Sequence, residues 1–168
     1  MGSIEVDDQV ALVNALVIAG LADETKIGCY GWSYGGYMAL MLLAKAPSLF
    51  SVGVSGAPVT NWDGYDTAYS ERYMGHPETN AEAYKESSVM THARKISGKV
   101  MLVHGVVDEN VHVRHTFRLI NKLIEVNVPH ELLLFPNERH APRDAEGKAY
   151  MERRIKHFLL RTLSPTRA

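Results

Sequence analysis

Apolar residues along the chain alternate between short continuous runs and helical spacing. The short runs predict four strands, at Ile27–Tyr30, Val52–Gly56, Lys99–His104 and His130–Phe135. Helical spacing predicts helices around them, over Val6–Val17, Met38–Ala44, Tyr65–Met74, Ala81–Ser88, Val113–Ile124 and Met151–Leu159. In the helix after the third strand, Val113, Phe117, Ile120 and Ile124 are expected to form the apolar stripe. The alternation indicates one α/β domain, a parallel sheet of about four strands covered by helices.

A G-x-S-x-G motif lies between the first predicted strand and the helix that follows it. Strand, motif and helix together are typical of a nucleophile elbow, with Ser33 on a sharp, strained turn. Side chains two residues from the serine would crowd this turn, which explains Gly31 and Gly35. The backbone N–H of Tyr34 would then stabilise an oxyanion at the helix N-terminus. The alternative is a glycine-rich turn that happens to contain a serine.

A serine nucleophile needs an acid and a base, which in such folds follow it in the order Asp/Glu, then His. Asp108 comes after the Lys99–His104 strand and His140 after the His130–Phe135 strand. Parallel strands end at the same edge of a sheet, so these loops should meet the elbow. Of eight histidines, only His140 follows both other groups and lies in such a loop, whereas His104 should support its loop. Glu109 remains an alternative to Asp108.

Four segments carry a family resemblance. They are the elbow GWSYGGY at 31–37, HGVVDENVH at 104–112, FPNERH at 135–140, and APVTNW at 57–62 with YSERYM at 69–74. Over Ile4–Leu163 the chain resembles the C-terminal catalytic part of prolyl oligopeptidase-family serine peptidases, nearest to the dipeptidyl peptidase IV branch. The resemblance implies the C-terminal portion of an α/β-hydrolase fold, with Ser33 as nucleophile, Asp108 as acid and His140 as base.

The resemblance also implies a specificity pocket for a proline ring. Aromatic faces suit that compact apolar ring. Its lining would be Tyr34, Val59, Trp62, Tyr65, Tyr69, Asn110 and Val111. Spacing alone would favour a small satellite core for the same aromatics.

About thirty residues precede Ser33, enough for one helix and one strand. Residues 1–168 are therefore expected to be a partial hydrolase domain, without its N-terminal half, the upstream tyrosine that would be the second oxyanion donor, or the family's β-propeller. The unpaired apolar edge should then associate with the missing half or with a second copy. Two hypotheses follow: a serine peptidase that cleaves peptides after proline or alanine, or a catalytically weak fragment that binds a partner. An esterase would use the same triad.

Composition limits partners and compartment. A net charge of −1 favours neither nucleic acid nor an anionic membrane as a partner. Cys29 is the single cysteine, so no intrachain disulfide forms, which suits a reducing, cytoplasmic compartment. The sequence shows no signal peptide or transmembrane run. No metal or cofactor is expected.

Overall fold

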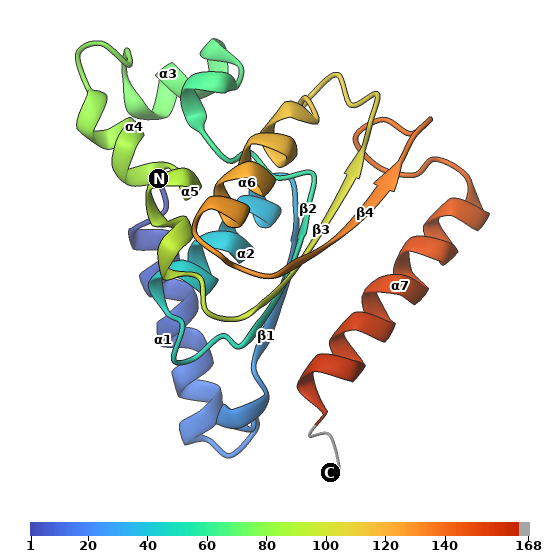
Figure 1. Cartoon of the computed structure of the whole chain (residues 1–168). Helices are drawn as coiled ribbons and strands as arrows, with labels where there is room; N and C mark the ends of the chain where they lie inside the picture. The colour runs from blue at the N-terminus through green and yellow to red at the C-terminus, as the bar shows by residue number, and fades with distance from the viewer. Residues whose placement is uncertain (165–168) are drawn as a thin grey trace.

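The computed structural model describes residues 1–164 and is built on a central parallel sheet (Figure 1). Its four strands lie in the order β1-β2-β3-β4. They span β1 (Gly28–Trp32), β2 (Val52–Gly56), β3 (Lys99–Gly105) and β4 (His130–Phe135). Each strand coincides with a predicted apolar run, and β1 extends as far as Trp32. The predicted α/β fold is confirmed.

Helices cover both faces of the sheet unequally. One face carries α1 (Ile4–Ile18), α2 (Tyr34–Lys45), α3 (Thr67–Met74), α4 (Ala81–Ser87), α5 (Val89–His92) and α6 (Arg114–Glu125). The other face is covered by α7 (Ala145–Leu163) (Figure 1). Short 3₁₀ turns lie at Glu24–Lys26, Trp62–Gly64 and Ala93–Lys95.

The two central strands, β2 and β3, are buried along almost their whole length because helices cover both faces of the sheet there, whereas β1 and β4 are more exposed. In β3, Val100 and Leu102 belong to the core under α2 and α6. Met101 and Val103 point the other way and pack in the core under α7. The two-residue period of the strand thus divides its side chains between two cores.

The apolar stripe predicted for α6 is right at Val113, which is buried, and at Ile120, which packs against the core, but wrong at Phe117 and Ile124. The helix buries His115, Thr116, Leu119 and Leu123, whereas Phe117 is 42% exposed and Ile124 65% exposed. Thr116 is buried because its hydroxyl lies 2.7 Å from Nδ1 of His104. Leu119 and Leu123 follow Thr116 by three and seven residues, so the three lie on one face of the helix.

An apolar surface extends along the β1 edge of the described sheet. Within residues 1–164, β1 has β2 as its one neighbouring strand. Several apolar residues of α1 are exposed near this edge, among them Ile18, whose exposed fraction is 86%. A groove of about 500 Å³ runs between α1, β1 and α2, with Val13, Met38 and Phe50 in its walls. No helix within residues 1–164 has the length and apolar character needed to cross a membrane.

Candidate active site

The four strands deliver every predicted site residue to one edge of the sheet. Ser33 and Tyr34 follow β1, and the segment after β2 carries Val59, Trp62, Tyr65 and Tyr69. The loop after β3 carries Asp108, Asn110 and Val111, and the loop after β4 carries His140. The carboxyl ends of parallel strands are the usual place for functional groups in α/β folds.

Ser33 has the backbone strain expected of a nucleophile elbow. Its φ of 58° and ψ of −117° lie where residues with a Cβ rarely occur, at a cost on the order of 1–3 kcal/mol. The Ser33 amide donates to the carbonyl of Gly56 at 2.8 Å, which holds the turn against β2. Ser33 is also the N-cap of α2, so the helix N-terminus is directed at the site.

The expectation for the two glycines holds for one of them. A Cβ on Gly31 would lie 2.1 Å from the carbonyl oxygen of Gly35, so Gly31 must be glycine. A Cβ on Gly35 would meet nothing within 4 Å, and that part of the prediction is wrong. The crowded position in the helix is Gly36, whose Cβ would lie 2.3 Å from the oxygen of Gly56. Gly31 packs on the backbone of Gly35, while Gly35 borders the open groove beside β1.

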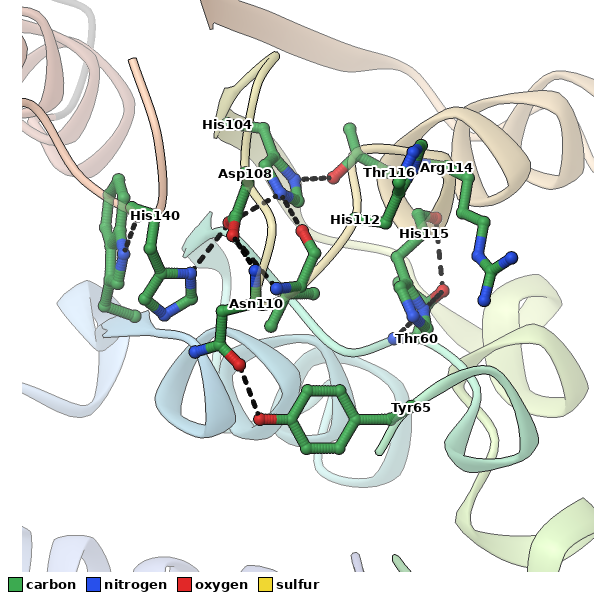
Figure 2. Close-up of polar contacts among 12 residues, drawn as sticks. Thr60, Tyr65, His104, Asp108, Asn110, His112, Arg114, His115, Thr116 and His140 are labelled. Atoms are coloured by element: carbon green, nitrogen blue, oxygen red, sulfur yellow. Dashed lines mark hydrogen bonds and ion pairs between the residues drawn. The ribbon is translucent and has the colours of Figure 1, made fainter. Parts of the chain in front are cut away.

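Asp108 and His140 form a close pair (Figure 2). His140 Nδ1 lies 2.7 Å from Oδ2 of Asp108, with the imidazole 29% exposed and the carboxylate buried. The other oxygen, Oδ1, accepts from the amides of Asn110 at 2.9 Å and Val111 at 3.0 Å. The loop backbone therefore orients the carboxylate, and the carboxylate orients the imidazole.

A second histidine contacts the same carboxylate from inside the sheet. His104 Nε2 lies 3.2 Å from Oδ2 of Asp108 and 2.8 Å from the carbonyl of Val111. Both neighbours are acceptors, so Nε2 carries the proton and Nδ1 accepts from the Thr116 hydroxyl. His104 thus supports the acid loop, as its position in the sequence predicts.

Asp108 is ionised in this environment. Burial raises its pKa, but hydrogen bonds from His104, His140 and the Val111 amide outweigh burial and hold the pKa well below its usual range. Glu109, the alternative acid, instead pairs with Arg139 at 2.7 Å on the surface. The carboxylate that faces His140 is that of Asp108.

Ser33 and His140 lie on loops at the same sheet edge, yet no hydrogen bond joins them among the residues that the structure describes. Such bonds are often long in unliganded enzymes and form when substrate binds. Whether the Ser33 hydroxyl and the His140 imidazole can meet therefore depends on how the backbone positions their two segments.

The predicted pocket residues form one contiguous cluster. The Trp62 ring is buried and stacks on Tyr69, with centroids 5.8 Å apart, and it meets Tyr34 at 5.7 Å. Tyr65 packs edge-on against Trp62 at 5.8 Å, and its hydroxyl donates to Oδ1 of Asn110 at 2.9 Å (Figure 2). Val59 and Val111 are buried in the same core. The cluster joins the loops after β2 and β3.

His115, in the first turn of α6, fixes the pocket loop (Figure 2). Its Nδ1 accepts from the Thr60 amide at 3.3 Å, and its Nε2 lies 3.2 Å from the carbonyl of Gly64. Burial lowers the pKa of His115 to about 4, so the ring is neutral and Nε2–H donates to Gly64. One imidazole thus holds both ends of the segment that contains Trp62.

Two further hydrogen bonds at the site are not predicted by the sequence analysis. The Tyr34 hydroxyl donates to Oε1 of Glu5 at 2.6 Å, across 29 residues. The Trp32 indole N–H donates to the carbonyl of His140 at 2.8 Å, across 108 residues. Nothing in the local sequence marks Glu5, while Trp32 is marked by its place beside Ser33.

Other reactive groups lie outside this arrangement. Burial raises the pKa of the Cys29 thiol to about 12, so the thiol stays protonated at neutral pH. Within residues 1–164, no three histidine, cysteine, aspartate or glutamate side chains are arranged to hold a metal ion.

Comparison with known proteins gives consistent matches. Residues 1–166 match the model of the prolyl oligopeptidase family. Human dipeptidyl peptidase 8 is 42% identical over 97% of this chain, which spans 19% of that protein. Bovine dipeptidyl peptidase 4 is 32% identical over 98% of the chain, which spans 22% of that protein. The crystal structure of Porphyromonas gingivalis dipeptidyl peptidase 4 superposes with a TM-score of 0.92 at 34% identity, over 96% of this chain and 23% of that one. The chain therefore spans about a fifth of the length of these relatives.

Proposed function

The chain belongs to the prolyl oligopeptidase family, and from this premise we propose that it is a serine peptidase of the dipeptidyl peptidase type, which cleaves after proline or alanine. Residues 1–168 would be the C-terminal portion of its α/β-hydrolase domain. The observation that carries the proposal is the Asp108–His140 hydrogen bond of 2.7 Å at the sheet edge that also holds the strained Ser33.

In the proposed reaction, His140 Nε2 takes the proton of Ser33 Oγ as Oγ attacks the scissile carbonyl carbon. The carbonyl oxygen becomes an oxyanion, to which the Tyr34 amide donates. The tetrahedral intermediate collapses, the C–N bond breaks, and His140 gives its proton to the leaving amine. Water then hydrolyses the ester on Ser33 by the same proton route. Asp108 accepts from Nδ1–H throughout, which leaves Nε2 free to act as the base.

Substrate preference is assigned to the aromatic cluster after β2. The half-buried rings of Tyr65 and Tyr69 would offer their faces and edges to a small apolar side chain beside Ser33, and the buried Trp62, Val59 and Val111 would support them from behind. Asn110 holds Tyr65 in place. An esterase would use the same Ser33, Asp108 and His140, but the Ala57–Trp62 and Tyr69–Met74 segments favour a peptidase.

The exposed β1 edge favours a second role, in assembly. A strand edge bordered by exposed apolar side chains of α1 is a surface that pairs with further polypeptide. We propose that it takes up the remaining part of the same hydrolase domain, or a second copy of the chain. Without an upstream oxyanion donor, turnover would fall by about 10²–10³, so the 168 residues alone would be a weak catalyst.

Covalent labelling by a fluorophosphonate tests the nucleophile without any substrate. Ser33→Ala should abolish labelling. Ser55→Ala is the matched control, because the buried Ser55 hydroxyl is already bound to the carbonyl of Gly36 at 2.8 Å. Labelling that persists in Ser33→Ala, or that is lost only in Ser55→Ala, would contradict the proposal.

Sedimentation with an Ala-Pro amide assay tests the assembly role. The chain alone should self-associate and turn over slowly, and coexpression with an upstream hydrolase segment should restore both solubility and turnover. A monodisperse monomer with turnover of about 1–10³ per second would show that the β1 edge needs no partner.

A further inference from the structure

The indole of Trp32 joins the strand before the nucleophile to the loop that carries His140. Trp32 ends β1 and directly precedes Ser33, and its Nε1–H donates to the carbonyl oxygen of His140 at 2.8 Å. The acceptor is the backbone of His140, so the bond fixes the loop independently of its imidazole. Two segments 108 residues apart are held together beside the reacting groups.

Trp32 has a dedicated slot for its ring. Trp32 lies opposite Gly56 in the β1–β2 register, and a Cβ on Gly56 would lie 1.9 Å from Cε3 of the indole. The carbonyl of the same Gly56 accepts from the Ser33 amide at 2.8 Å. The ring also packs on the apolar core under α7. Gly56 therefore positions the nucleophile through its carbonyl and admits the indole through its missing side chain.

The other hydrogen bonds and ion pairs of the His140 loop join it to a different segment. His140 Nδ1 is bound to Asp108, the carbonyl of Glu138 accepts from the Val107 amide at 3.1 Å, and Arg139 pairs with Glu109. All three tie the loop to the segment after β3. Among the hydrogen bonds and ion pairs of residues 1–164, the Trp32–His140 bond is the one that ties this loop to the strand bearing the nucleophile.

We propose that Trp32 is a positioning residue that sets the distance between the His140 base and Ser33; this rests on the proposed function. Without its N–H, the Asp108–His140 pair stays intact but moves as a unit relative to the elbow. A misplacement of about 1 Å at a reacting group can cost 10²-fold in rate. Trp32→Phe keeps an aromatic ring in the slot and removes the donor, and it should lower the rate of fluorophosphonate labelling about 10–100-fold.

The double-mutant cycle of Trp32→Phe with His140→Ala separates positioning from general damage. If Trp32 acts through His140, Trp32→Phe slows labelling of the wild-type protein but leaves the residual rate of His140→Ala unchanged. If the indole only stabilises the fold, both rates fall by the same factor, which overturns the proposal. Tyr30→Phe is the control: it lies two residues earlier on β1 and loses only an exposed 3.5 Å contact with Glu152. Its labelling rate should equal that of the wild type.

Replacement of Trp32 by 3-benzothienylalanine covers the case in which Trp32→Phe folds poorly. Sulfur takes the place of N–H in a ring of nearly the same shape, so packing is kept while the donor is lost. Slow labelling with an unchanged urea midpoint supports the proposal, and labelling at the wild-type rate overturns it. Wild-type protein that is not labelled at Ser33 at all overturns the proposed function and this role with it. A labelled wild type with no effect in either Trp32 variant overturns the role of Trp32 alone.

Discussion

His104 and His140 contact the same oxygen of Asp108, and they should respond oppositely to removal. His104 is fully buried, whereas the His140 side chain is 29% exposed. We expect His104→Ala to lower the free energy of unfolding severely and His140→Ala to leave it nearly unchanged. We expect labelling at Ser33 to fall to a slow residual rate in His140→Ala and to stay at the wild-type rate in the folded fraction of His104→Ala.

The size of the His104 effect follows from the partners that it leaves behind. The Val111 carbonyl and the Thr116 hydroxyl, at 2.8 and 2.7 Å, would both lose their bond to His104 inside the core. A buried polar group left unpaired costs about 1–3 kcal/mol, so the two cost about 2–6 kcal/mol together. Asp108 itself keeps three donors, from His140 and from the amides of Asn110 and Val111.

Urea unfolding and fluorophosphonate labelling on the same samples measure the two effects. The matched control is Thr116→Val, which removes one hydrogen bond to His104 but keeps the side-chain volume, and it should cost less than His104→Ala. The reasoning is refuted if His104→Ala unfolds like the wild type and loses labelling while His140→Ala labels at the wild-type rate. In that case His104 would be the base.

Three further results follow from the same contacts. Burial raises the pKa of Glu5, but hydrogen bonds from the Tyr34 hydroxyl and the Ser3 amide outweigh burial and lower it from 4.5 to about 2. The bonds to the carboxylate thus stabilise the fold fully above pH 4.5 and are lost as the pH falls through 2, so the melting-temperature advantage of wild type over Glu5→Gln should shrink across that window. Gly31→Ala should lower the melting temperature sharply, because its Cβ would lie 2.1 Å from a backbone oxygen, while Gly35→Ala, with nothing within 4 Å, should not; equal melting temperatures would contradict this. In the full-length enzyme, Trp62→Ala or Tyr65→Ala should weaken the preference for proline over leucine by about 1–3 kcal/mol in kcat/KM; an unchanged preference in both would mean that these rings are only core.

The sequence predicted the strands, the edge at which their loops meet and the order of the three reactive groups. These features are local: apolar runs mark strands buried on both faces, and a G-x-S-x-G between strand and helix marks a turn. The local sequence does not decide whether His140 pairs with Asp108 or with Glu109. The pairing depends on Asp108 pointing inward, where the Asn110 and Val111 amides hold it.

The error in the stripe predicted for α6 also comes from a contact between residues that lie on different elements. Counting apolar residues selected Phe117 and Ile124, whereas the buried face includes Thr116, a polar residue. Its burial is explained by His104, twelve residues earlier and on a different element, whose Nδ1 needs a hydrogen-bond donor inside the core. The long-range contacts of Trp32 and Glu5 cannot be predicted from the sequence for the same reason.

The geometry of this site depends on residues that carry no chemistry of their own. Gly56 pairs with Trp32 in the sheet, accepts the Ser33 amide and leaves room for the indole that reaches His140. A side chain at Gly56 would therefore disturb both the turn at Ser33 and, through Trp32, the loop that carries His140. His115 does the same for the pocket, since it fixes Thr60 and Gly64 on either side of Trp62. Both act as rigid supports whose loss would appear as lower turnover rather than as a missing reactive group.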